Sequence, residues 1–216
     1  NSSPHIDLMI IGAQKAGTSS LLNYMRDHTE ICAHHGNEFS YFADDNAYEQ
    51  GYKKAFPTYF SKKSFKKVVA KNVTICSNET ALKRLKEHNP DVKIVFMLRE
   101  PASRAYSSYT MGVSQGWMKN SFEDVAQTVL DKSEDSQLYQ LFISLGIYAS
   151  QLETLGRYFD PSQIRIVLFE DLKNDSSQVY LNLIEWLNVS PDPIESKKAH
   201  NVTTKAKSSS LAGLIN

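Results

Sequence analysis

A short glycine-containing stretch near the start of the chain has the residue types that bind anions. It reads GAQKAGTS from Gly12 to Ser19, and it lies between an apolar run and a segment with helical spacing. Glycines allow the backbone to approach a ligand closely, and the N–H groups at the start of a helix favour negative charge. Lys15 adds a full positive charge inside the loop. The stretch therefore predicts a phosphate-binding loop between a strand and a helix.

The place of the lysine separates this loop from the ATP-binding type. In the G-x-x-x-x-G-K-[ST] loop, a lysine follows the second glycine and reaches the β- and γ-phosphates, and the next hydroxyl binds magnesium. Here Thr18 follows Gly17 and takes the place of that lysine. We therefore expect a smaller anion that is bound without a metal, and no metal site. The alternative is a P-loop kinase or NTPase, which would need magnesium and a triphosphate.

A second anion-binding group is predicted in the stretch VFMLREPASRAYSSY. Arg99 lies at the carboxyl end of the predicted strand Lys93–Leu98, which is where open α/β sheets bind ligands. Ser107 follows about two turns into the next helix. An arginine can bind a phosphate through two parallel hydrogen bonds, so Arg99 and Ser107 could hold a second phosphate together. Arg104, between them, is expected to be a surface or ion-paired residue as readily as a phosphate contact.

These groups need a framework of buried strands and covering helices. Residues 6–12 form an almost continuous apolar run, as expected for a strand that is covered on both faces. Thr18 and Ser19 are expected to cap the next helix with their hydroxyls. Further strands are predicted at 30–35, 93–98 and 164–169, and helices at 18–28, 79–88, 102–113, 121–132, 137–159 and 175–188. Strands that alternate with helices predict an α/β fold, with one domain over residues 1–216 and a central parallel β-sheet flanked by helices.

The overall composition fits one globular domain and limits the kinds of partner that the chain is expected to bind. The chain has 216 residues, 41% of them hydrophobic, and a net charge of zero. These values suit a single core and disfavour nucleic acid as the main partner. No apolar run approaches the ~20 residues of a membrane span, so no transmembrane segment is expected. The sequence leaves the oligomeric state open.

Residues 46–70 are rich in lysine. We interpret them as the solvated face of a helix, with a surface for an anionic acceptor as the alternative. The lysines concerned are Lys53, Lys54, Lys62, Lys63, Lys66 and Lys67.

Two cysteines and six glycosylation sequons bear on the compartment. Cys32 and Cys76 have no zinc-binding spacing, and two free buried thiols are expected rather than a disulfide. The sequons indicate a secretory protein, although a glycan at Asn72 or Asn201 would obstruct the proposed site. Localisation therefore stays open between the Golgi lumen and a bacterial or phage-like cytoplasm, and the cytoplasm is favoured. The sequons begin at Asn1, Asn72, Asn78, Asn174, Asn188 and Asn201.

Taken together, these stretches resemble the sulfotransferases that use 3′-phosphoadenosine 5′-phosphosulfate (PAPS), most of all the carbohydrate and heparan-type enzymes and their bacterial relatives. IIGAQKAGTSSL resembles the loop that binds the 5′-phosphosulfate, and VFMLREPASRAYSSY resembles the segment that binds the 3′-phosphate. NEFSYF resembles the K-E-x-x-[FY]-F box of the family, and SLGIYASQLETLGRYF resembles its G-x-Y-x-x-Q-L helix. HNVTTKAKSS resembles the tail loop that closes over the cofactor.

The resemblance implies a metal-free transfer of a sulfuryl group from PAPS to a hydroxyl or amine of a small molecule or glycan, with a carbohydrate favoured. It implies that Glu38 is the general base of an in-line displacement, that Lys15 stabilises the leaving phosphate, and that Lys71 is a second stabiliser. A non-catalytic module that binds the product PAP is a further alternative. The residues implied in binding PAPS are Gly12, Gln14, Lys15, Ala16, Gly17, Thr18, Ser19, Arg99, Ser107 and Lys205.

The chain departs from the family pattern mainly on the acceptor side. Asn37 stands where the box has lysine, and Ser40 lies where heparan-type enzymes often have histidine. NVTI follows Lys71 in place of Thr-Pro-x-Tyr, and Thr203-Thr204 replaces Ser-Gly in the tail. The donor is therefore better determined by the sequence than the acceptor.

Overall fold

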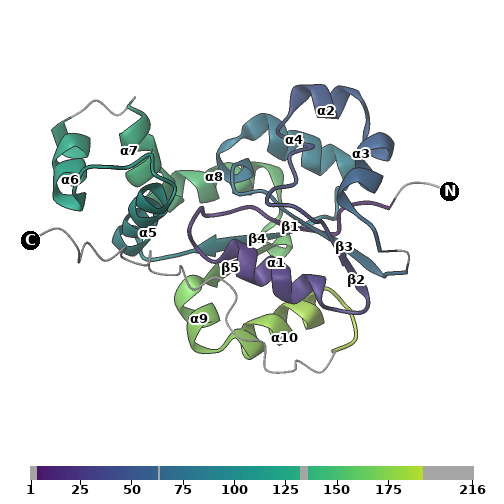
Figure 1. Cartoon of the computed structure of the whole chain (residues 1–216). Coiled ribbons are helices and arrows are strands. Elements are labelled where there is room, and N and C mark those ends of the chain that lie inside the picture. The colour runs from purple at the N-terminus through teal and green to yellow at the C-terminus, as the bar shows by residue number, and fades with distance from the viewer. Residues whose placement is uncertain (1–3, 63, 132–135, 192–216) are drawn as a thin grey trace, which may run out of the picture.

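A five-stranded parallel β-sheet forms the centre of the protein (Figure 1). The computed structural model describes residues 4–62, 64–131 and 136–191. Along the sheet the strands follow the order β2-β3-β1-β4-β5, and every neighbouring pair is parallel. The predicted single α/β domain with a central parallel sheet is confirmed. The strand bounds are Leu8–Ile10 for β1, Ile31–Ala33 for β2, Lys67–Lys71 for β3, Lys93–Leu98 for β4 and Ile164–Leu168 for β5.

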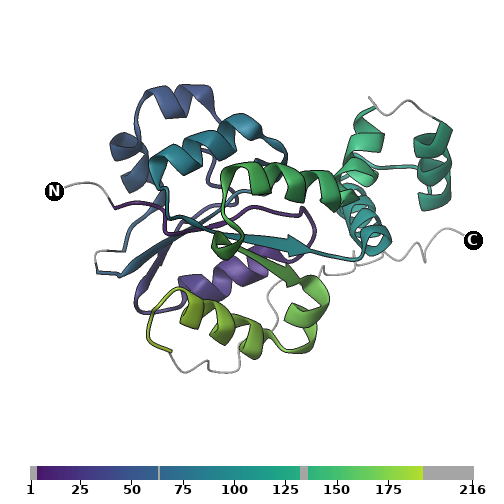
Figure 2. The same ribbon diagram turned by 180° about the vertical axis from the view of Figure 1, so that it is seen from behind.

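Helices cover both faces of the sheet. Figures 1 and 2 show α1, α9 and α10 on one face and α2, α3, α4 and α8 on the other, with α5, α6 and α7 in a lobe to one side. Because the sheet is covered on both faces, β1 is apolar along its whole length and completely buried. The helix bounds are Thr18–Arg26 for α1, Asp45–Glu49 for α2, Tyr52–Tyr59 for α3, Glu79–His88 for α4, Pro101–Ser114 for α5, Phe122–Asp131 for α6, Gln137–Phe142 for α7, Tyr148–Tyr158 for α8, Phe169–Asn174 for α9 and Ser176–Trp186 for α10. Three short 3₁₀ turns are η1 at Ile75–Ser77, η2 at Ser144–Gly146 and η3 at Pro161–Gln163.

Strand β3 begins inside the region 46–70, where the sequence favours a solvated helical face, so that expectation is wrong for this segment. Val69 and Ala70 are completely buried in the sheet between β1 and β2. Lys67 opens the strand and pairs with Asp7 at 3.0 Å. The three apolar residues at the centre of KVVAK therefore make this segment a buried strand. The lysines at its two ends pair with carboxylates.

Two other lysines of this region form contacts at the amino edge of the sheet. Lys62 donates to two main-chain carbonyls at and just before the start of β2, and Lys66 pairs with Glu30. These contacts hold the amino ends of β2 and β3 together, so they lie at the edge opposite the cavity described below. Lys53 and Lys54 are exposed on α3, and Lys63 lies outside the described residues.

The predicted helix over 137–159 is wrong, because η2 separates two helices there, α7 and α8. The guanidinium of Arg104 on α5 donates to the main-chain carbonyls of Leu141 (2.9 Å) and Phe142 (2.7 Å). In a continuous helix those carbonyls would accept from N–H groups four residues further on.

Arg104 is completely buried, so the expectation of a surface or ion-paired residue is wrong. Its third hydrogen bond goes to Ser108 Oγ at 3.2 Å, and no carboxylate within the described residues pairs with it. Burial lowers the pKa of its guanidinium. The side chain joins α5 to α7 beside a small second core, which is formed by Met118, Val125, Val129 and Phe142.

Both cysteines are buried free thiols, as the sequence predicts. Cys32 lies on β2 and Cys76 lies on η1. Burial raises the pKa of each thiol, so both stay protonated near neutral pH.

Candidate active site

A cavity of ≈ 790 Å³ opens at the carboxyl edge of the sheet. It is bounded by the loop after β1, the ends of β3 and β4, and one face of α5. Parallel sheets bind ligands at this edge, because the strands and the loops that follow them converge there. The cavity brings together nine of the residues predicted from the sequence: Gln14, Lys15, Gly17, Thr18, Ser19, Glu38, Lys71, Arg99 and Ser107.

Three predicted residues are not among those that line the cavity. Gly12 and Ala16 are buried residues of the loop itself. A Cβ at Gly12 would lie 3.0 Å from Cys76 Sγ, and the φ of 149° at Gly12 is one that other residues rarely adopt. Gly12 therefore determines the loop conformation without lining the cavity. Lys205 lies outside the described residues, as does the sequon at Asn201.

The positive end of helix α1 faces this cavity. Gly17, with φ 84°, is the N-cap, so the expectation that Thr18 and Ser19 cap the helix is wrong. Gly17 has no side chain with which to cap the helix, and the first turn contains no acidic residue. A helix start of this kind favours a bound anion.

Lys15 carries the one positive charge inside the loop. Its backbone has φ 71°, an unusual value for a residue with a side chain. Its ammonium lies 3.6 Å from Met111 Sδ, a weak acceptor. Burial, and to a smaller extent the charge of Arg99, lowers the pKa of Lys15. An anionic ligand would therefore stabilise this half-buried cation.

Arg99 connects the end of β4 to the loop. Its Nη1 donates to the main-chain carbonyl of Lys15 at 3.1 Å, and its guanidinium lies 4.4 Å from the centre of the Phe169 ring. Tyr148 donates from its hydroxyl to the carbonyl of Arg99 at 2.7 Å. These three contacts fix both ends of the arginine before any ligand binds.

Two buried polar atoms at the cavity have no protein partner within the described residues. They are Nε of Arg99, a donor, and Oε1 of Gln14, an acceptor. Buried polar groups in proteins are nearly always hydrogen-bonded, so unpartnered ones mark positions that a ligand or water completes. A ligand with both acceptors and donors, such as a nucleotide, fits this pair.

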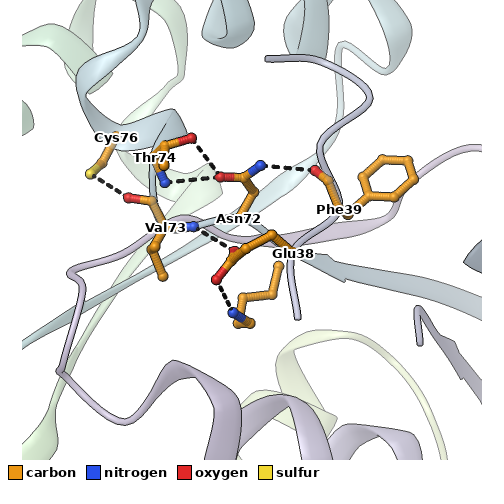
Figure 3. Close-up of polar contacts among 7 residues, drawn as sticks. Glu38, Phe39, Asn72, Val73, Thr74 and Cys76 are labelled. Atoms are coloured by element: carbon orange, nitrogen blue, oxygen red, sulfur yellow. Dashed lines mark hydrogen bonds and ion pairs between the residues drawn. The ribbon is translucent and has the colours of Figure 1, made fainter. Parts of the chain in front are cut away.

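A carboxylate and a second lysine form another part of the cavity wall. Figure 3 shows the carboxylate of Glu38 beside the main chain of Val73. Lys71 Nζ lies 2.5 Å from Glu38 Oε1, and the Val73 N–H donates to Oε2 at 3.0 Å. The Lys71 side chain is 3% exposed, whereas that of Glu38 is 31% exposed. The carboxylate is therefore held at both oxygens and still faces the cavity.

Several contacts at the site go beyond the residues predicted from the sequence. Tyr148 is the tyrosine of the G-x-Y pattern in SLGIY, so the sequence did carry a signal for it. Met111 lies four residues after Ser107, which places both on one helix face. Phe169 and Val73 carry no comparable signal, because their contacts depend on how distant segments pack.

The fold and the site together define an α/β protein with a P-loop-like anion-binding loop at the carboxyl edge of its sheet. Residues 5–214 match the family described as the sulfotransferase domain. The chain belongs to this family.

Curated relatives include enzymes named for heparan sulfate. The chain is 30% identical over 176 residues to heparan sulfate glucosamine 3-O-sulfotransferase 3B1 of Mus musculus, covering 77% of this chain and 42% of that protein. It is 24% identical over 204 residues to the bifunctional heparan sulfate N-deacetylase/N-sulfotransferase 1 of Caenorhabditis briggsae, covering 88% of this chain and 23% of that protein. The chain thus spans less than half the length of either relative.

Solved structures share the fold. A sulfotransferase from Alicyclobacillus acidocaldarius superimposes with a TM-score of 0.75 at 24% identity, covering 91% of this chain and 87% of that one. Mouse sulfotransferase SULT7A1, complexed with PAP, gives a TM-score of 0.56 at 12% identity, covering 88% and 62%.

Among the described residues, no helix has the length and apolar character that a membrane span requires. Likewise, that part of the chain contains no cluster of three or more His, Cys, Asp or Glu residues placed to hold a metal ion.

Proposed function

We propose that this sulfotransferase moves a sulfuryl group from PAPS to a hydroxyl or amine of a carbohydrate, without a metal, and that residues 1–216 form one sulfotransferase domain. The observation that carries the proposal is one cavity that contains an anion-binding loop with Lys15 and Arg99, and also the carboxylate of Glu38. A fold neighbour complexed with PAP supports the donor, and relatives named for heparan sulfate support the acceptor class.

The donor end of the cavity has the chemistry that a nucleotide with two phosphate-type groups requires. The start of α1 and Lys15 would hold the 5′-phosphosulfate, and Arg99 with Ser107 would hold the 3′-phosphate. Arg99 Nε and Gln14 Oε1 offer an unused donor and an unused acceptor at the same cavity. When bound, PAPS supplies the sulfuryl group that the acceptor oxygen or nitrogen attacks.

Glu38 is proposed as the general base. The acceptor must lose a proton as it attacks sulfur, and a carboxylate within hydrogen-bond reach typically contributes ~10²–10⁴-fold to such a step. Lys71 and the Val73 N–H fix the two oxygens of Glu38. Once Glu38 has taken the proton, its charge no longer holds the Lys71 ammonium, which can then stabilise negative charge in the transition state.

Lys15 is proposed to stabilise the leaving phosphate. Its ammonium has only a thioether as a polar contact within the described residues. A preorganised cation in a partly buried site stabilises developing charge better than the same cation in water.

The test combines binding and turnover. PAP should raise the thermal stability of the protein, and a ligand at 100 times its dissociation constant adds about 2.7 kcal/mol. ³⁵S-labelled PAPS should transfer label to at least one member of a panel of neutral and anionic sugars, amino sugars and simple alcohols. Stabilisation by ATP–magnesium and not by PAP would instead favour the kinase alternative. Binding of PAP with no turnover on any acceptor would favour a non-catalytic module.

A further inference from the structure

The side chain of Asn72 links two segments that are distant in the sequence (Figure 3). Asn72 directly follows β3 and is 2% exposed. Its Nδ2 donates to the carbonyl of Phe39 at 3.1 Å. Its Oδ1 accepts from the main-chain N–H of Thr74 at 2.9 Å and from Thr74 Oγ1 at 2.7 Å. One buried amide therefore joins the turn after β3 to the residue that follows Glu38.

Both of the linked segments hold the carboxylate of Glu38. Asn72 lies between the two residues whose atoms contact that carboxylate, Lys71 through Nζ and Val73 through its N–H. Phe39, on the other segment, also donates from its N–H to the Lys71 carbonyl at 2.7 Å. The Asn72 amide thus closes a small network in which the backbone of Glu38 and the donors to its side chain have fixed relative positions.

We propose that Asn72 is a positioning residue for the general base of the reaction. The inference rests on the proposed function, because it takes Glu38 as the base. A base must lie within about 2.6–3.2 Å of the proton-bearing atom, and a misplacement of about 1 Å can cost on the order of 10²-fold in rate. Asn72 does not line the cavity, so it acts through Glu38 and Val73 without touching the substrates.

The chain offers a matched control in Asn78. Asn78 is also an asparagine of a sequon, and its Oδ1 also accepts from a main-chain N–H, that of Ala81 at 2.9 Å. It caps α4 and does not line the cavity. Loss of its amide should therefore destabilise the fold without disturbing Glu38.

The experiment compares Asn72→Ala, Asn72→Asp and Asn78→Ala in the full chain. Asn72→Asp keeps an acceptor for Thr74 and replaces the donor to Phe39, so it isolates the link to the second segment. We measure kcat and KM with labelled PAPS and the best acceptor of the panel, the dissociation constant of PAP, and the melting temperature. Both Asn72 variants should lose at least about ten-fold in kcat and change PAP affinity less than about two-fold. Asn78→Ala should lower the melting temperature and keep kcat.

Two results would overturn the proposal. One is a kcat in the Asn72 variants that matches that of Asn78→Ala, and the other is a loss that appears in PAP affinity instead of kcat. If Asn72→Ala does not fold, Asn72→Asp and Thr74→Val are compared with Asn78→Ala instead. Thr74→Val loses only the hydrogen bond from Oγ1 to Asn72. Thr74→Val should then fall between wild type and Asn72→Asp in kcat.

Failure of the proposed function would be recognised separately, because the wild type would then transfer label to no acceptor. In that case amide hydrogen exchange tests the structural part of the role, which is whether Asn72 orders the segments that hold Glu38. The Val73 and Thr74 amides should exchange at least about ten-fold faster in Asn72→Ala, while the amides of β1 and β4 keep their protection. Unchanged exchange at Val73, or equal acceleration in all strands, would refute the role.

Discussion

Arg99 Nη1 donates to the main-chain carbonyl of Lys15 at 3.1 Å, so the two cations of the proposed donor site are connected before a ligand binds. The bond leaves other donors of the guanidinium for a phosphate, since an arginine has five N–H groups. The ring of Phe169 also packs against the guanidinium of Arg99, with its centre 4.4 Å from Cζ. An already ordered arginine loses little side-chain entropy when it binds an anion.

Arg99→Ala should therefore weaken donor binding more than it slows chemistry. We expect the dissociation constant of PAP to rise at least about ten-fold, which corresponds to about 1.4 kcal/mol. Arg99→Lys should recover only part of this, because a lysine has no planar fork. Titration with PAP measures the effect. Arg157→Ala on α8, which removes an exposed arginine paired with Glu79, is the control. Normal PAP affinity in Arg99→Ala would remove Arg99 from the 3′-phosphate site.

Lys15→Ala should damage both donor affinity and kcat, because one charge serves the bound donor and the transition state. Lys53→Ala, which removes an exposed lysine of α3, should change neither. The lowered pKa of Lys15 adds a pH dependence. Lys15 becomes neutral at a lower pH than the ordinary 10.5, so PAP affinity should begin to fall at a lower alkaline pH than that value implies. An alkaline profile that is identical in wild type and Lys15→Ala would contradict the assignment.

Glu38→Gln should keep PAP binding and lose turnover by about 10²–10⁴-fold. The amide keeps the shape of the side chain and cannot take the proton. Glu30→Gln is a matched control at the opposite edge of the sheet, since Glu30 also pairs with a lysine, Lys66, and also accepts from a main-chain N–H, that of Ser190. Steady-state rates with labelled PAPS compare the two variants. A turnover equal to wild type in Glu38→Gln would exclude Glu38 as the base.

His34, at the end of β2, should make the fold sensitive to acid. Burial, assisted by the charge of Lys71, lowers its pKa from 6.5 to about 3, and neither ring nitrogen has a partner within the described residues. Below about pH 6.5, His34 takes up a proton in the unfolded chain but stays neutral in the folded chain. The free energy of unfolding therefore falls as the pH falls towards 3. The slope is up to about 1.4 kcal/mol per pH unit for one such group. His88, with a pKa lowered to about 4, acts in the same direction.

Urea unfolding between pH 7.5 and 4.5 measures this slope. His34→Leu should reduce it, whereas a change at the neighbouring exposed residue, His35→Gln, should not. An unchanged slope in His34→Leu would mean that other groups cause the acid sensitivity.

The sequence predicts the parts of this protein that depend on local patterns. The runs 6–12 and 93–98 are apolar enough to indicate buried strands, and the glycine spacing of the loop indicates an anion site. Strand β3 could not be predicted in this way, because three apolar residues between two lysines resemble a short helical face as much as a strand. Its place in the sheet is decided by contacts with β1 and β2.

Long-range contacts explain the other differences. The helix break at η2 depends on Arg104, which is distant in sequence from the carbonyls it binds. The stacking of Phe169 under Arg99 depends on β5 pairing with β4. In the candidate site, residue types and spacing indicate Lys15 and Arg99, and the resemblance to the family indicates Glu38. None of these signals reveals which groups hold the three side chains.

The burial of the Asn72 amide restricts when this asparagine could be glycosylated. Asn72-Val73-Thr74 is an acceptor sequence for oligosaccharyltransferase, yet its nitrogen already donates within the fold and has no room for a sugar. A chain that entered the endoplasmic reticulum would have to complete β3 and the following turn before the transferase reached it. Any molecule modified first would carry an oligosaccharide on a side chain that the fold buries.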